Sequence, residues 1–298
     1  MFRQVKVAAI SMKPTPWDKA GNADKLERLI RKAARRKPDL IVGSEGALEG
    51  YVSHQAQKEP KKAAELLKLA ERIDGPCIAR FRALARMLKT CLCFGFAERV
   101  GRCVYNSALF IDDRGRICGT YRKHEEPILI FRGTRPVWPA QPMGRRLRAF
   151  DTPLGRCGLM ICADRWYSRL ARTLVLDGAR FLLVPAYGSK NREQNQTILA
   201  RARENGVPVV EANVGMNLIV SRGEIAAYQW GKDRITTTMI DIPLPPSREA
   251  ARCYEREYLR LRNAEKWKWL PESFRTYPPI GHPAPMRRRT ARRLRWEM

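Results

Sequence analysis

The chain has 298 residues and a formal net charge of +27, from 57 Lys and Arg against 30 Asp and Glu. A chain of this length can bury a large core, either as one large domain or as two small ones. No N-terminal segment has the features of a secretory signal and no apolar run reaches membrane-spanning length, so we expect a cytoplasmic protein with no membrane partner.

The excess of positive charge is spread along the sequence. The last segment, 283–298, contains six arginines and one glutamate, so most of the charge lies elsewhere. A basic surface can bind polyanions, but no RNA-recognition motif, zinc finger or aromatic-rich basic stripe accompanies it here. We therefore expect a solvated basic surface with, at most, non-specific polyanion binding.

The eight cysteines are too sparse for the disulfide framework of a small secreted domain. Most of them lie in apolar runs, which is typical of reduced core residues. The chain has no Cys-x-x-Cys pair, only three histidines and no phosphate-binding Gly-rich loop. We expect neither a metal site nor another cofactor.

Strand-like and helix-like segments alternate along most of the chain. Residues 5–10 are expected to form a strand, 24–37 an amphipathic helix, and 40–42 a short apolar strand. The same patterns predict helices at 61–73, 79–88, 170–176 and 194–204, and strands at 91–97, 104–111, 181–184, 207–212, 218–220, 225–230 and 236–242. Interleaved strands and helices indicate an α/β architecture.

The composition changes near residue 243. Pro243, Pro245 and Pro246 end the last expected strand, because proline cannot donate to a strand ladder. The sequence that follows is first helix-compatible and then rich in Pro, Arg and Trp. We therefore divide the chain into a domain of residues 1–245 and a basic C-terminal extension of residues 246–298, which is ordered or partly disordered.

Three apolar runs lead to a reactive side chain. Glu45, Lys123 and Cys162 each stand at the end of a predicted strand. A free thiol is mostly protonated near neutral pH, so a nucleophilic cysteine needs a base or a positive charge beside it. A carboxylate, an ammonium group and a thiol are the parts of a hydrolytic site that uses a thiolate.

The order and flanks of these residues resemble the nitrilase, or carbon–nitrogen hydrolase, superfamily. Seven segments carry the resemblance in the family's order: 5–10, 45–51, 121–123, 150–156, 177–186, 200–205 and 211–215. The resemblance implies a four-layer α-β-β-α sandwich that dimerises into an eight-layer sandwich, with larger homo-oligomers as an alternative. It also implies that the extension crosses to a partner subunit, unless the extension is disordered.

The superfamily shares a Glu-Lys-Cys triad, which the resemblance places at Glu45, Lys123 and Cys162. Cys162 would be the nucleophile, and Glu45 would take and return its proton. Lys123 would stabilise the oxyanion together with the backbone N–H of Ala163. Relatives often carry a second active-site glutamate, for which Glu126 is the candidate, although the residue before it is also a glutamate.

The residues after the nucleophile favour amides over nitriles. Ala163-Asp164 resembles the amidase and carbamoylase branches, whereas nitrilases usually have Trp-Glu there. Arg165 would bind a substrate carboxylate, as in some carbamoylases, or pair with Asp164 or another acid. Ser168-Arg169 departs from the family's Pro-Glu and inverts the local charge. The expected substrate is a small amide or N-carbamoyl compound, and the products are a carboxylic acid and ammonia or an amine.

Two other functions stay open on the residues alone. A Cys–His hydrolase would use His54 or His124 in place of the triad. A catalytically silent protein of the same fold would bind acidic partners through its charge. Substituting the histidines tests the first alternative, and salt-sensitive binding tests the second.

Overall fold

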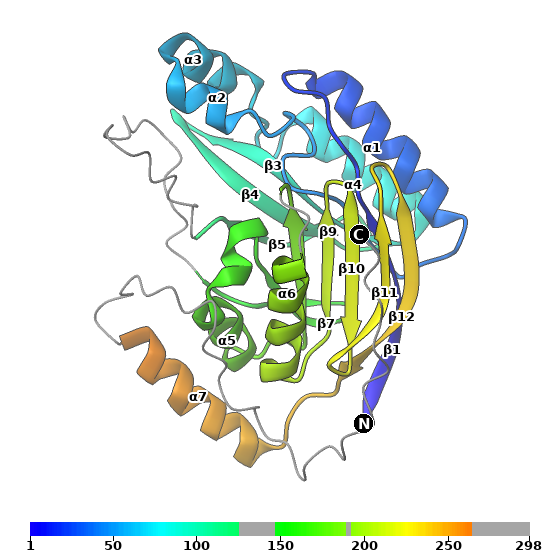
Figure 1. Ribbon diagram of the computed structural model, residues 1–298, viewed down its shortest axis with the longest axis vertical. Helices are drawn as coiled ribbons and strands as arrows, with labels where there is room; N and C mark the ends of the chain where they lie inside the picture. The colour runs from blue at the N-terminus through cyan, green and yellow to red at the C-terminus, as the bar shows by residue number, and fades with distance from the viewer. Residues whose placement is uncertain (125–146, 189–191, 264–298) are drawn as a thin grey trace.

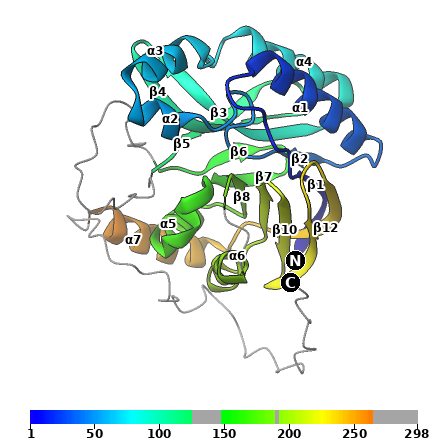
Figure 2. The same ribbon diagram turned by 45° about the horizontal axis from the view of Figure 1, so that its top comes forward.

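The protein is a sandwich of two sheets between two helical layers. The computed structural model describes residues 1–124, 147–188 and 192–263. Two six-stranded sheets face each other, and helices cover their outer faces (Figures 1 and 2). The four-layer α-β-β-α architecture predicted from the sequence is confirmed, whereas its dimerisation stays a prediction.

The first sheet joins the N-terminal half of the chain to the last strand. Its order is β12-β1-β2-β3-β4-β5. The strands are β1 (Phe2–Ile10), β2 (Leu40–Val42), β3 (Cys91–Val100), β4 (Cys103–Ile111), β5 (Ile117–Arg122) and β12 (Ile235–Pro243). β1, β2 and β3 run parallel, and β5 returns to their direction because β4 is antiparallel to both of its neighbours.

The second sheet has the order β11-β10-β9-β8-β7-β6. Its strands are β6 (Phe150–Thr152), β7 (Gly155–Leu159), β8 (Phe181–Ala186), β9 (Val209–Asn213), β10 (Met216–Ser221) and β11 (Glu224–Trp230). β7, β8 and β9 are parallel, so their carboxyl ends meet at one edge of the sheet. Loops at such an edge are where α/β proteins usually place their sites.

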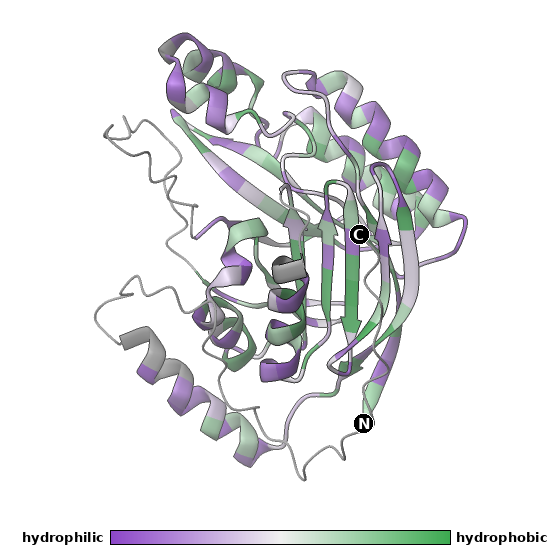
Figure 3. Cartoon of the chain, in the orientation of Figure 1, coloured by the Kyte–Doolittle hydropathy of each residue, from purple (hydrophilic) through white to green (hydrophobic). Residues whose placement is uncertain are grey.

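The outer layers are helical. In Figure 2, α1 (Lys19–Ala34) and α4 (Pro76–Leu88) cover the first sheet, while α5 (Ser168–Leu176) and α6 (Arg192–Asn205) cover the second. α2 (Ser53–Lys58) and α3 (Pro60–Leu69) lie beside the far end of β3 and β4, and α7 (Arg248–Asn263) packs against α5. Figure 3 shows the strands of the second sheet as largely hydrophobic, whereas the helices outside carry hydrophilic side chains.

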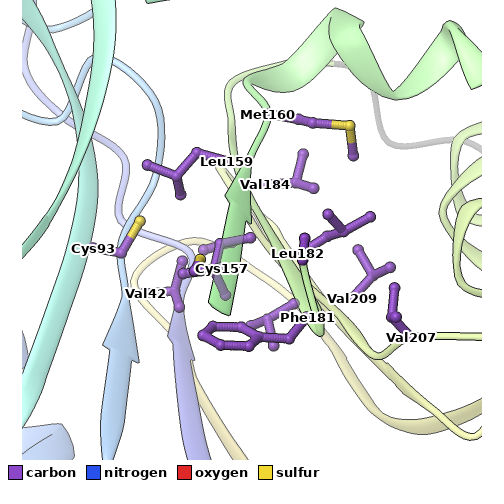
Figure 4. Packing of buried hydrophobic residues seen from close by; sticks show 14 of the residues in the cluster. Val42, Cys93, Cys157, Leu159, Met160, Phe181, Leu182, Val184, Val207 and Val209 are labelled. Atoms are coloured by element: carbon purple, nitrogen blue, oxygen red, sulfur yellow. The ribbon is translucent and has the colours of Figure 1, made fainter. Parts of the chain in front are cut away.

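The main core lies between the two sheets. Side chains alternate between the faces of a strand, so in β1 Val7 points into this core while Ala8 packs against the helices. Figure 4 shows Val42 and Cys93 of the first sheet facing Cys157 of the second. All eight cysteines are free. The prediction that most of them are core residues holds for four, Cys91, Cys93, Cys157 and Cys162, whereas Cys77 and Cys118 are half-buried and Cys103 and Cys253 are exposed.

Two helices differ most from the predicted elements. α1 begins at Lys19 rather than at residue 24, because the Asp18 carboxylate accepts the Gly21 N–H at 2.9 Å and caps the helix. The helix ends before Pro38, which disfavours a helical residue in front of it. α2 was not predicted, and its six residues are too few to show a clear helical period.

The cysteine segment also differs from the prediction. β7 ends at Leu159, so Cys162 does not end the strand as expected but opens the 3₁₀ helix η1 (Cys162–Trp166). The turn forms because the Asp164 carboxylate accepts the N–H of Ile161 at 2.8 Å. Within the described ranges no helix is long and apolar enough to cross a membrane.

Candidate active site

Glu45 lies in the turn that follows β2 and is fully buried. Its backbone N–H donates to the Ala186 carbonyl at 3.4 Å, which links the ends of β2 and β8 across the two sheets. β3 passes this turn at Gly95, where an added Cβ would stand 2.7 Å from the Glu45 Cα. A side chain at position 95 would therefore push the glutamate out of place.

Three donors hold the Glu45 carboxylate. Lys123, one residue beyond β5, donates from Nζ to Oε1 at 2.9 Å, and Asn106 of β4 donates to the same oxygen at 2.7 Å. The backbone N–H of Tyr187 donates to Oε2 at 2.9 Å. The structure thus brings Glu45 and Lys123 together as predicted and adds two groups that sequence reasoning missed.

Cys162 occupies a strained backbone position at the start of η1. Its φ is 48°, in the left-handed region that a residue with a Cβ rarely adopts, and its side chain belongs to the buried set at 7% exposure. The thiol donates to the Tyr187 carbonyl at 3.5 Å. Tyr187 therefore contacts both the predicted base and the predicted nucleophile through its backbone.

Asp164 stabilises the turn that carries the thiol. One carboxylate oxygen accepts the Ile161 N–H and the Tyr121 hydroxyl, each at 2.8 Å. Tyr121 belongs to β5, two residues before Lys123, so this contact ties the cysteine turn to the lysine strand. The fixed turn holds the backbone of Ala163, the predicted oxyanion donor, directly after the nucleophile.

The charges around the thiol oppose one another. Burial raises the pKa of Cys162 to about 11, the Glu45 charge adds to this effect, and Arg165 and Lys123 act against it. Burial alone would lower the pKa of Lys123. The negative charges around it, of which those of Glu45 and Cys162 have the largest effects, outweigh burial and raise the pKa. Lys123 therefore remains an ammonium ion, and the thiol needs a proton acceptor to become a nucleophile.

Arg165 is buried beside the predicted nucleophile. Its side chain is 1% exposed, and Nη1 donates to a carboxylate oxygen of Glu211 in β9, which is equally buried. Nη2 lies 4.0 Å from the Cys162 Sγ. Of the two roles weighed for Arg165, pairing with an acid is the one seen, and the acid is Glu211 rather than Asp164.

Tyr187, whose backbone contacts the Cys162 thiol, belongs to a small group of aromatic rings. Tyr51 stacks on Tyr187 with ring centroids 4.3 Å apart, and His54 packs edge-on against Tyr51. The His54 Nε2 lies 3.2 Å from the Tyr51 hydroxyl. In the described part of the chain, the hydrogen-bond partners of the Cys162 thiol are Tyr187 and Arg165, and no histidine is among them.

The remaining predictions for the site concern Glu126 and metal binding. Glu126 lies outside the described residues, so its role stays a prediction. Among the described residues no group of three or more His, Cys, Asp and Glu side chains could hold a metal ion. Asn106 could have been noticed as a polar residue inside an apolar strand, but the backbone of Tyr187 has no sequence signal.

Comparison with known proteins identifies the family. A model described as carbon-nitrogen hydrolase matches residues 6–245. An N-carbamoylputrescine amidase of Oryza sativa is 30% identical over 236 residues, which cover 78% of this chain and 73% of the relative. A citrullinase of Francisella tularensis is 29% identical over 242 residues, which cover 78% of this chain and 81% of the relative.

A solved structure supports the fold. The crystal structure of a carbon–nitrogen hydrolase from Helicobacter pylori superposes with a TM-score of 0.68 at 22% identity and covers 88% of this chain and 95% of that one. The family match spans most of the chain and includes Glu45, Lys123 and Cys162. The chain belongs to the carbon–nitrogen hydrolase family, whose members are enzymes that act on C–N bonds other than peptide bonds.

Proposed function

We propose that this enzyme hydrolyses a small amide or N-carbamoyl compound through a thioester on Cys162. The observation that carries the proposal is the convergence of Glu45, Lys123 and Cys162 on one buried site from the segments that follow β2, β5 and β7. Nucleophile, proton acceptor and fixed positive charge are the three groups that amide hydrolysis needs, because the carbonyl is a weak electrophile and the amine a poor leaving group.

In the first step, Glu45 takes the thiol proton as the Cys162 sulfur attacks the carbonyl carbon. The raised pKa of the thiol makes this transfer necessary near neutral pH. Lys123 and the Ala163 N–H stabilise the negative oxygen of the tetrahedral intermediate. The proton on Glu45 then passes to the departing nitrogen, and the C–N bond breaks.

In the second step, Glu45 takes a proton from a water molecule that attacks the carbonyl carbon of the thioester, or of the corresponding thiocarbamate when the substrate is a ureido compound. The C–S bond then breaks, and Glu45 passes the proton to the Cys162 sulfur. An amide substrate yields a carboxylic acid, with ammonia or an amine released earlier. From an N-carbamoyl amine, the water releases carbamic acid, which decomposes to carbon dioxide and the second nitrogen product. Glu45 returns to its starting state with Lys123 and Asn106 still in contact with it.

The names of two relatives support an N-carbamoyl compound, rather than a simple amide, as the substrate of this chain. N-carbamoylputrescine and citrulline, the compounds in the names of two relatives, both carry a terminal ureido group. A ureido carbonyl bears nitrogen on both sides, so either can leave from the same intermediate. We propose a ureido compound as the preferred substrate and nitriles as poor ones, in keeping with Ala163-Asp164 after the nucleophile.

The test is ammonia release from a panel of ureido compounds, ω-amides, aliphatic amides and nitriles. Cys162→Ala should abolish release, and Glu45→Gln and Lys123→Met should each reduce kcat by at least about 100-fold. His54→Ala and His124→Ala are the matched controls and should retain most of the activity. Release that survives Cys162→Ala, or that depends on either histidine, contradicts the proposal.

We further propose that the enzyme is a cytoplasmic homodimer or higher homo-oligomer, with the extension 246–298 reaching a partner subunit. α7, the part of the extension that the structure describes, is a helix that packs against α5 of its own chain, so the proposal has to be tested on the whole extension. Light scattering of the full chain and of a chain ending at residue 245 measures the contribution of the extension. If both chains form particles with the same number of subunits, the extension does not contribute to assembly.

A further inference from the structure

A buried arginine lies directly beneath the proposed nucleophile. Arg165 follows Cys162 by three residues in η1, and in a 3₁₀ helix such residues lie above one another on the same face. The Arg165 Nη2 approaches the Cys162 Sγ to 4.0 Å, and the arginine side chain is 1% exposed. A guanidinium stays protonated even when buried, so this is a permanent positive charge beside the sulfur.

Glu211 contacts the other terminal nitrogen of the same guanidinium. Its carboxylate accepts the Arg165 Nη1–H, and neither side chain is more than 1% exposed. The Nε–H of Arg165 is buried and has no hydrogen-bond partner among the described residues. Glu211 therefore takes only part of the donor capacity of the guanidinium, and the Nη2 edge remains directed at the sulfur.

Other charged groups face the thiol from neighbouring elements. Glu45, after β2, disfavours the thiolate, whereas Arg165 in η1 and Lys123 after β5 favour it, with Arg165 the larger of the two. The Lys123 charge is taken up by Glu45 at 2.9 Å. Arg165 is also paired with a carboxylate, that of Glu211, but of the two carboxylates it is Glu45 whose charge raises the pKa of the thiol. Arg165, with Nη2 4.0 Å from the sulfur, is the cation whose contact with the thiol the structure shows.

We propose that Arg165 is a positioning residue that stabilises the thiolate of Cys162. The negative charge of Glu211, which pairs with Arg165, limits this stabilisation. The inference rests on the proposed function, because it requires Cys162 to be the nucleophile. It assigns Arg165 a different role from binding a substrate carboxylate, since both of its terminal nitrogens face groups of the protein.

Substitutions of Arg165 and of Glu211 should change the amount of Cys162 thiolate in opposite directions. Arg165→Met removes the positive charge, so less thiolate forms at a given pH. Glu211→Gln keeps an oxygen that can accept from Arg165 but removes the negative charge, so more thiolate forms. If Arg165 and Glu211 only packed the turn, the two substitutions would not change the amount of thiolate in opposite directions. Arg165→Lys is the control that keeps the positive charge.

The experiment measures alkylation of Cys162 by iodoacetamide between pH 6 and 10 in the full-length protein. Peptide mapping by mass spectrometry separates Cys162 from Cys157, which lies nearby in the sequence. A pKa shift of one unit changes the thiolate fraction about tenfold, and the opposing change in nucleophilicity leaves a net rate change of about threefold. We expect at least that much slowing in Arg165→Met and acceleration in Glu211→Gln, with folding checked by circular dichroism.

A second measurement separates this role from carboxylate binding. N-carbamoylputrescine and citrulline share a ureido group, but only citrulline has a carboxylate. Arg165→Met should lower kcat/KM for both compounds by a similar factor and move the alkaline part of the pH–rate profile. A rise in KM confined to citrulline overturns the inference.

The outcomes also distinguish this inference from the proposed function. If Cys162 is not alkylated in the unmodified protein, the proposed function and the inference both fail. If Cys162 reacts but Arg165→Met and Glu211→Gln change its rate in the same direction, or not at all, the inference alone fails. Should Arg165→Met not fold, Glu211→Gln decides, because an unchanged or slower alkylation in that variant is sufficient to reject the inference.

Discussion

Replacing Lys123 by methionine should destabilise the fold as well as slow catalysis. The Lys123 and Glu45 side chains are 4% and 0% exposed, and Nζ lies 2.9 Å from Oε1. At an effective dielectric constant of about 20, unit charges at this separation attract by about 6 kcal/mol, part of which offsets the desolvation of the two groups. Lys123→Met leaves a buried carboxylate beside two neutral donors, so we expect the free energy of unfolding to fall by about 3–5 kcal/mol.

The double variant Lys123→Met/Glu45→Gln separates stability from activity. It has no uncompensated buried charge, so it should be at least about 1 kcal/mol more stable than Lys123→Met alone. Its kcat/KM should nevertheless stay at or below that of the single variant, because one group stabilises the oxyanion and the other moves the proton. A double variant that regains stability but not activity therefore separates the structural role of the Lys123–Glu45 pair from its chemical role.

Urea unfolding followed by tryptophan fluorescence gives the stabilities, and ammonia release gives the rates. Lys62→Met is the control, because Lys62 pairs with Glu65 on the surface, where the two side chains are 34% and 49% exposed. Such a pair contributes about 1 kcal/mol or less. The reasoning is refuted if Lys123→Met unfolds at the same urea concentration as the unmodified protein, or if the double variant is the least stable of the set.

Three further predictions concern the surroundings of the site. Gly95→Ala should reduce kcat by at least about 100-fold, because its Cβ would stand 2.7 Å from the Glu45 Cα and displace the base, and steady-state kinetics measures this. Asn106→Leu should lower kcat/KM about tenfold by removing the 2.7 Å hydrogen bond to Glu45, and equal kinetics in both proteins contradicts a positioning role. Burial, with a smaller effect of the Glu45 charge, raises the pKa of Glu49 to about 7, so the folded protein keeps this proton after the unfolded chain has lost it. Stability should therefore fall by about 1.4 kcal/mol per pH unit between the unfolded and folded pKa values and level off above pH 7, and unfolding of Glu49→Gln at pH 5, 6, 7 and 8 should lack this contribution.

Local patterns were sufficient for most of the fold. The segments 40–42 and 225–230 were predicted within one residue of β2 and β11, because short apolar or alternating runs between breakers have a clear period. α1 was misplaced at its start, since its cap at Asp18 is a single hydrogen bond that leaves no trace in the apolar period. α2 was missed for a different reason, because its six residues are too few to show a helical period.

For the site, the sequence by itself determined the family and the candidates Glu45, Lys123 and Cys162, because each stands in a motif whose flanking residues are local. Only the tertiary structure decided what surrounds them. Asn106 is 61 residues and Tyr187 142 residues from Glu45, and the Glu211 that pairs with Arg165 is 46 residues away. A buried polar group must find a partner, but which distant group it finds depends on how the two sheets bring their strand ends together, and no local pattern records that.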